Sequence, residues 1–93
     1  MAAAPLATYF KAPNEVLDYS LDWSGWLKGD FITNSSWATP AGLGEVLDLF
    51  GASLATVWLS GGVEGVSYDV VNHITTAGGR QAERTIRITV VLR

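Results

Sequence analysis

Apolar and polar residues alternate along three segments of the chain, and this alternation predicts β-strands. The clearest segment runs from Glu15 to Trp23, where apolar residues occupy every second position from Leu17 onward. The same period of two continues through residues 67–74 and 85–92. Because successive side chains of a strand point to opposite faces, one face of each segment is expected to lie in a hydrophobic core.

Three further segments are predicted as strands from weaker patterns. Residues 31–33 are β-prone and follow a Lys-Gly-Asp turn, and an extended path resumes at residues 37–39. Residues 54–60 include Thr, Val and Trp and end at a pair of glycines. The spacing of residues 43–50 fits a short helical turn nearly as well as a strand, and we interpret this segment as a strand.

The last two alternating segments are predicted to form one hairpin around Gly78 and Gly79. Both strands bury their even-numbered positions, so an even-numbered residue pairs with an even-numbered one and the two numbers sum to an even value. The loop between the strands should then hold an odd number of residues, three or five, as bulged hairpin loops do. Asp69 and Arg87 then face outward, opposite or diagonal to each other, as a cross-strand ion pair. The predicted core consists of Leu17, Tyr19, Leu21, Trp23, Ile32, Val70, Ile74, Ile86, Ile88 and Val90, with Tyr68 near its edge and Leu92 on the same inward face.

A chain of 93 residues with many short strands and no convincing helix is typical of one small all-β domain. We expect an immunoglobulin-like antiparallel β-sandwich of six to seven short strands. Tyr68, at the start of a late strand, suits the tyrosine corner of such domains, although an ordinary core position fits it almost as well. The sequence contains no cysteine, so this sandwich lacks the disulfide found in many secreted domains.

The first ten residues are predicted to form an N-terminal arm, and the sandwich domain then spans residues 11–93. The arm is uncharged and includes Leu6, Tyr9 and Phe10. Without a basic start, and interrupted by Pro5, it does not resemble a signal peptide. Because exposed aromatic side chains are unfavourable in water, we expect the arm to be mobile in the free subunit and ordered against a neighbour after assembly; a frayed tail is the alternative.

The chain is poor in charge, with 16% charged residues against about a quarter in typical soluble domains. Much of its surface is therefore neutral, which favours contacts with other proteins. Residues 1–75 carry eight acids and two lysines, whereas residues 76–93 carry four arginines and one acid. Two interpretations are open: a basic edge strand that resists unwanted pairing, and attraction between acidic and basic faces of neighbouring copies. Neither nucleic acid nor a membrane is predicted as a partner, because the positive charge is sparse and no apolar run is long enough.

No catalytic, cofactor or metal site is predicted, and we expect the protein not to be an enzyme. The only histidine, His73, is expected on the outer face, about 13 Å along its strand from Asp69, which is too far for a hydrogen-bonded pair. No serine stands in a G-x-S-x-G context. Asp18, Asp22 and Asp30 do not have the spacing of a calcium loop, and solvated acids on an outer face explain them more simply.

The four tryptophans are unusual for a chain of this length. Trp23 belongs to the inward-facing set, whereas Trp26 follows a Ser-Gly break and is expected to be partly exposed, together with Trp37 or Trp58. Exposed aromatic side chains serve at protein interfaces and as stacking platforms for sugars. Packing of all four in the core is at least as good an explanation.

The sequence also resembles a known family of small tailed-phage structural proteins, described as fibre-tail adaptor proteins. The resemblance spans residues 10–93. It implies a non-catalytic virion component with an immunoglobulin-like fold, assembled in many copies, and it brings no catalytic residues. The segments that carry it are Phe10-Lys11-Ala12-Pro13-Asn14-Glu15-Val16-Leu17-Asp18-Tyr19-Ser20-Leu21-Asp22-Trp23, Trp26-Leu27, Gly29-Asp30, Ser36-Trp37, Pro40-Ala41-Gly42-Leu43, Val57-Trp58-Leu59-Ser60-Gly61-Gly62 and Ile74-Thr75-Thr76-Ala77-Gly78-Gly79-Arg80.

These observations together predict a structural subunit of a tailed-phage virion, assembled in the host cytoplasm. It would act as an adaptor at the tail, neck or fibre, or as a decoration protein on the capsid, through contacts with other virion proteins and with copies of itself. A carbohydrate-binding module for host-surface glycans is the alternative. The residues predicted to lie at interfaces are Leu6, Tyr9, Phe10, Trp26, Asp69, His73 and Arg87.

Overall fold

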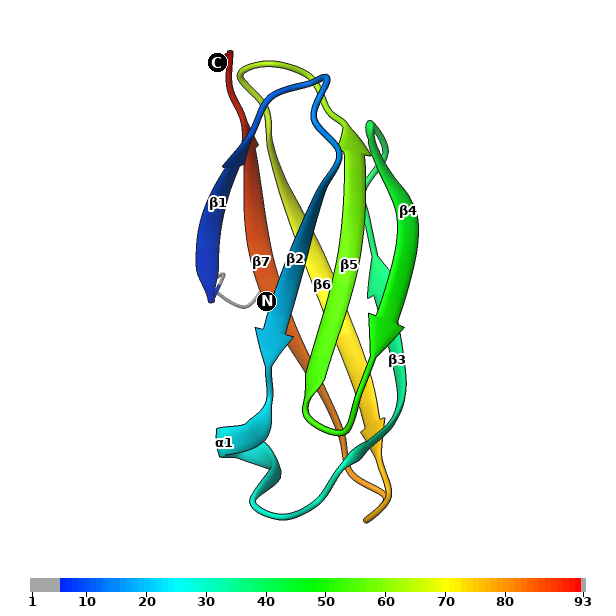
Figure 1. Cartoon of the computed structure of the whole chain (residues 1–93). Coiled ribbons are helices and arrows are strands. Elements are labelled where there is room, and N and C mark those ends of the chain that lie inside the picture. The colour runs from blue at the N-terminus through cyan, green and yellow to red at the C-terminus, as the bar shows by residue number, and fades with distance from the viewer. Residues whose placement is uncertain (1–5, 93) are drawn as a thin grey trace.

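A computed structural model describes residues 6–92, which form two facing β-sheets (Figure 1). One sheet has the strand order β1-β7-β6-β3 and the other the order β2-β5-β4. The fold is therefore the all-β sandwich that the alternating pattern predicted. The elements described are β1 (Ala7–Lys11), β2 (Leu17–Asp22), α1 (Ser24–Leu27), β3 (Ile32–Ala38), β4 (Leu43–Phe50), β5 (Leu54–Gly61), β6 (Ser67–Thr76) and β7 (Gln81–Val90).

The strand order is immunoglobulin-like, with one strand in a different place. Constant-type immunoglobulin domains place the first, second, fourth and fifth strands in one sheet and the remaining three in the other. Here β1 lies instead in the sheet of β3, β6 and β7, where it pairs with β7 in parallel. All other strand pairs are antiparallel. The prediction of an antiparallel sandwich thus holds except at this one pair.

β1 corrects the predicted boundary between an N-terminal arm and the domain. Residues 7–11 pair with residues 86–90 of β7, and the Leu6 N–H donates to the carbonyl oxygen of Thr85 at 2.7 Å. Leu6, Tyr9 and Phe10 therefore belong to the folded sheet of the single chain and not to a mobile arm. The rest of the predicted arm, residues 1–5, lies outside the described residues.

The predicted core is confirmed at nearly every position. Val70, Ile74, Ile88 and Val90 are completely buried, and the even-numbered faces of β6 and β7 point inward as expected. Leu17 is only half-buried at the start of β2. Leu92 was placed on the wrong side: it is 79% exposed because β7 ends at Val90 and the alternation of the strand no longer applies.

The last hairpin has the predicted odd loop. Thr75 pairs with Gln81, and the N–H of Thr76 donates to the carbonyl oxygen of Arg80 at 2.9 Å, which leaves residues 77–79 as the turn. Gly79 adopts a φ of 82°, a left-handed conformation that other residues rarely take. Gly79 therefore permits the three-residue turn, and the odd length of that turn sets the register that points even-numbered side chains inward.

Two local features were predicted only in part. The Ser-Gly break after β2 is one turn of helix, α1, which buries Leu27 and ends at Lys28 with a φ of 49°. Tyr68 forms the tyrosine corner: its hydroxyl accepts a hydrogen bond from the N–H of Val63 at 2.9 Å, across the turn that leads into β6. Gly42 lets the ring approach, since a Cβ there would lie 3.0 Å from the hydroxyl oxygen.

Candidate interaction surfaces

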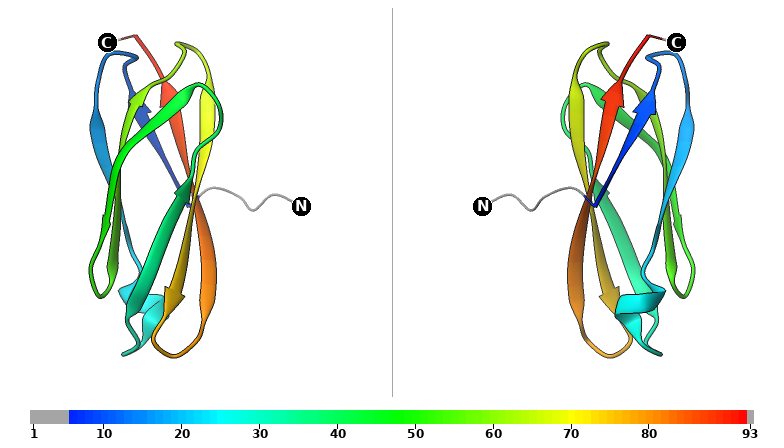
Figure 2. Two further views of the ribbon diagram at one scale, coloured as in Figure 1. Left: turned by 90° about the vertical axis from the view of Figure 1, so that its right-hand side faces the viewer. Right: turned by 90° about the vertical axis from the view of Figure 1, so that its left-hand side faces the viewer.

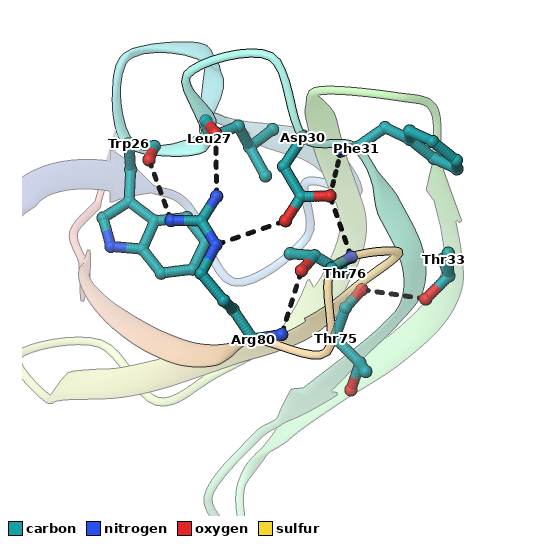
Figure 3. Close-up of polar contacts among 9 residues, drawn as sticks. Trp26, Leu27, Asp30, Phe31, Thr33, Thr75, Thr76 and Arg80 are labelled. Carbon is teal, nitrogen blue, oxygen red and sulfur yellow. Dashed lines mark hydrogen bonds and ion pairs between the residues drawn. The ribbon is translucent and has the colours of Figure 1, made fainter.

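Arg80 fastens the β6–β7 hairpin to α1 at one end of the sandwich (Figure 3). Its guanidinium donates to the Asp30 carboxylate at 3.2 Å and to the carbonyl oxygen of Leu27 at 2.7 Å. The same group lies over the ring of Trp26, 4.1 Å from the centroid. A planar cation stacks well on an indole face, so Arg80 covers part of the aromatic surface that Trp26 was expected to expose.

Asp30 connects the loop before β3 to the hairpin. Its carboxylate accepts hydrogen bonds from the N–H groups of Phe31, at 2.9 Å, and Gly78, at 3.0 Å. The Thr76 hydroxyl, those two N–H groups and Arg80 together lower the pKa of Asp30 to about 2. The carboxylate therefore stays ionised and holds the loop before β3 against the β6–β7 hairpin. It is not a solvated acid on an outer face.

The other described arginines also have partners within the chain. Arg84 lies over the ring of Trp23, 4.2 Å from the centroid, and Arg87 contacts Asp69. The hydrogen bond from the Ser24 N–H lowers the pKa of Asp22, and the charge of Arg84 lowers it further. Most positive charge of the C-terminal segment is thus matched internally, and β7 is an inner strand between β1 and β6, so it cannot be the predicted basic edge strand.

The Asp69–Arg87 pair forms as predicted on the outer face of the last hairpin. The residues are direct cross-strand partners, and the guanidinium contacts both carboxylate oxygens, at 2.9 and 3.3 Å. The hydrogen bond from Arg87 lowers the pKa of Asp69, and Asp69 raises that of Arg87. His73, farther along the same face, contacts the Glu83 carboxylate at 3.1 Å and the Gln81 side-chain oxygen at 3.0 Å.

The seven residues predicted at interfaces do not form one surface. Leu6, just before β1, and Phe10, on β1, are 58% and 54% exposed, whereas Tyr9 is half-buried with its ring centroid 5.2 Å from that of Tyr19. Trp26 lies within α1, which is at the end of the sandwich where the β6–β7 hairpin turns (Figure 1). The polar members already contact one another or neighbouring strands, so only Leu6 and Phe10 present open apolar side chains.

More exposed large apolar side chains lie on β4 than on any other described strand, in the segment where the sequence was ambiguous. Val46, Leu47, Leu49 and Phe50 are 59%, 49%, 56% and 44% exposed. β4 is one of the two edge strands of its sheet, β2 being the other, and no strand lies beyond it in the described part of the chain (Figures 1 and 2). We call this strand with those four side chains the β4 edge. The mixed spacing that made residues 43–50 resemble a helical turn was the only sequence signal for it.

A β-bulge in β4 brings two carboxylates to one face of the sheet. The register with β5 shifts between Glu45 and Leu47, so Glu45 pairs with Leu59 and Asp48 with Val57. Both β5 partners are fully buried and point inward, so both acids lie on that face. Partial desolvation raises the pKa of Glu45, and the neighbouring Asp48 carboxyl raises it further.

Two buried polar residues were not predicted. Lys11 is completely buried where the two sheets meet, and its ammonium donates to the carbonyl oxygens of Ala12, at 2.8 Å, and Gly61, at 2.6 Å. Burial lowers the pKa of Lys11, and the nearby Glu15 carboxylate opposes this. Asn72, expected only as an inward position, accepts a hydrogen bond from the indole N–H of Trp23 at 3.0 Å.

Within residues 6–92, no group of three or more His, Cys, Asp or Glu side chains is arranged to hold a metal ion. The helix described in that range is far too short to cross a membrane. Several ionisable side chains of the described residues, among them Lys11, Asp30 and Arg80, instead hold loops and strands of the chain together.

Polar side chains that mainly hold the chain together, and an exposed apolar strand at a sheet edge, are typical of structural and interaction domains. Its sequence matches the family described as podophage GP4 fiber-tail adaptor protein gp77 over residues 11–89. The chain belongs to this family, and it is a bacteriophage structural protein. A comparison with curated proteins found no match. The matched region begins at the last residue of β1 and ends one residue before the end of β7, so it contains nearly the whole sandwich.

Proposed function

We propose that this protein is a non-enzymatic subunit of the virion that joins tail and fibre components through protein–protein contacts. The observation that carries the proposal is the family match, which covers both sheets of the sandwich. The exposed β4 edge supports it, because apolar strands left open at a sheet edge are a common site of partner binding. Assembly in the host cytoplasm and presence in several copies complete the proposal.

The absence of catalysis is part of this proposal, and the polar contacts support it. His73, which would be the usual proton carrier, is engaged by Glu83 and Gln81 on an open sheet face. Hydrogen bonds within the chain lower the pKa of both Asp30 and Asp69, chiefly from Thr76 to Asp30 and from Arg87 to Asp69. A general acid or base needs a reacting group within hydrogen-bonding reach, and these side chains already have structural partners.

The position in the particle is tested by a cryo-EM reconstruction of intact virions. We expect density for the sandwich at the junction of tail and fibre, with a copy number set by the symmetry of that ring. Density spread over the capsid lattice would instead identify a decoration protein. Particles made without the gene should lack fibres while retaining normal heads, and particles with a full set of fibres would contradict the adaptor role.

A carbohydrate-binding role receives less support from the tryptophans. Trp23 and Trp37 are buried, and Trp26 has Arg80 over its ring. Trp58 is half-buried on the outer face of the sheet, with Leu47 as its neighbour on β4. One such side chain is a small platform for a sugar, and a glycan array with tryptophan fluorescence as readout should show no binding.

A further inference from the structure

The backbone of the β4 edge offers free hydrogen-bonding groups to a further strand. The N–H of Gly51 donates to a carbonyl oxygen of β5 at 2.8 Å, which defines a hydrogen-bonded position in the ladder. Such positions alternate in antiparallel pairs, so Leu47 and Leu49 also direct their backbone groups toward β5. Asp48 and Phe50 consequently direct theirs away from the sheet, toward the open side.

The same alternation places the backbone of Glu45 on the open side. Before the bulge, the N–H of Gly62 donates to the carbonyl oxygen of Gly42 at 3.0 Å, which makes these residues a hydrogen-bonded pair. Gly44, two positions later, again directs its backbone groups toward β5. The backbone N–H and C=O of Glu45 therefore point to the open side. Because of the bulge, Glu45 and Asp48 share both this backbone direction and one side-chain face.

The placement of these acids argues against pairing of β4 with β4 of a second copy. In the antiparallel register that overlaps all eight residues, residue 43 lies opposite residue 50, and Glu45 lies opposite Asp48 of the other copy. Four carboxylates would meet on one face at the centre of the contact, and like charges directly opposite are destabilising. Within one copy, partial desolvation raises the pKa of Glu45 and the Asp48 carboxyl on the same face raises it further, so two more acids opposite them would add to an existing cluster of negative charge.

A partner strand with basic side chains satisfies the same positions. We propose that the β4 edge binds an extended segment of a tail or fibre protein, which adds to the sheet as a further strand. It places Lys or Arg against Glu45 and Asp48 and apolar side chains beside Leu47 and Leu49. This inference rests on the proposed function for the source of the segment, and on the open strand, its exposed apolar side chains and its charge for the mode of binding.

The mode of binding is tested with the purified protein by supplying basic residues on a second copy. The double variant E45K/D48K keeps Leu47 and Leu49 but reverses the charge of the edge. By sedimentation, wild type and variant should each be monomeric, while their mixture should form a heterodimer at high micromolar concentration. A double variant with the same change of charge away from β4, D18K/E64K, should give no heterodimer with wild type.

A mixture that stays monomeric, or a wild type that dimerises alone through β4, would overturn the inference. Amide hydrogen exchange identifies the surface, because docking of a strand should protect the N–H groups of Glu45, Asp48 and Phe50. Protection elsewhere with an unchanged β4 would also overturn it.

The same variants in phage particles separate this inference from the proposed function. E45K/D48K should lower occupancy in virions by about tenfold or more, because like charges across an interface cost several kcal/mol. D18K/E64K should be incorporated as wild type is. Virions that lack even the wild-type protein would refute the proposed function. Virions that contain E45K/D48K at the wild-type level would refute only the role of the β4 edge.

Discussion

The buried contact between Trp23 and Asn72 allows one energetic prediction to be worked out in detail. Asn72 is completely buried on β6, and its side-chain oxygen accepts the indole N–H of Trp23. Its amide nitrogen donates to the hydroxyl of Ser35 at 2.9 Å and to the carbonyl oxygen of Ser36 at 3.0 Å. One side chain thus joins the end of β2 to β3 through the interior of the sandwich.

Replacing Asn72 with alanine leaves the buried Trp23 N–H without its acceptor and removes a part-buried hydrogen bond to the Ser36 carbonyl oxygen. An unsatisfied buried donor costs about 1–3 kcal/mol, and a lost hydrogen bond adds about 1 kcal/mol. We expect N72A to lower the free energy of unfolding by about 3 kcal/mol. This is a large part of the roughly 5–15 kcal/mol that holds a small domain folded.

The contribution of the indole contact is isolated by a double-mutant cycle with W23F, which removes the N–H but keeps an aromatic ring. Urea unfolding followed by circular dichroism gives the free energies of the four proteins. In the W23F background, N72A should cost about 1–2 kcal/mol less than in wild type. The reasoning is refuted if N72A costs less than about 0.5 kcal/mol, or if the two effects add within that margin.

Other consequences follow from burial and charge elsewhere in the chain. I88A should lower the free energy of unfolding by about 2–5 kcal/mol in the same urea assay, since Ile88 is completely buried; a loss of a few tenths would contradict the assigned face. Breaking the exposed Asp69–Arg87 pair with R87A should cost less than about 1 kcal/mol. Because the pKa of Asp30 is lowered from 3.8 to about 2, its stabilising contribution is present above pH 3.8 and is lost as pH falls toward 2, so wild type and D30N should converge in melting temperature over that range. Removing residues 1–10 should lower the melting temperature, because β1 pairs with β7 in the single chain; an unchanged value would restore the mobile-arm hypothesis.

The sequence was most informative where strands follow strict alternation. The alternation of even- and odd-numbered positions predicted the inward faces of β2, β6 and β7. It also predicted the odd hairpin loop and the Asp69–Arg87 pair, because a side-chain period of two allows few registers. The sequence of β1, ATYFK, does not alternate between apolar and polar residues, so it did not predict a strand with one inward face. Its inward positions include Lys11, whose buried ammonium is compatible with the core only because two carbonyl oxygens, one from the far end of β5, accept its hydrogen bonds.

The β4 edge and the arginine contacts needed three-dimensional information. The bulge at Val46 changes the face on which every later side chain of β4 lies, so no single period describes residues 43–50. Arg80 meets Asp30 across fifty positions of sequence, and the pairing depends on how two loops pack at one end of the sandwich. The sequence showed that charge is unevenly distributed. It did not show that most of the positive charge of the C-terminal segment is matched by partners in the same copy.

The parallel pairing of β1 with β7 determines how this protein would bear mechanical load. Ala7 pairs with Ile86 and Lys11 with Val90, so the chain enters at one end of the pair and leaves at the other. Tension between the two ends of the chain would act along both strands in opposite directions. The evenly spaced hydrogen bonds of a parallel pair would then be strained in shear and break together, not one after another as in a peeled hairpin. In the proposed role between tail and fibre, a load of this kind would be resisted mainly by these two strands.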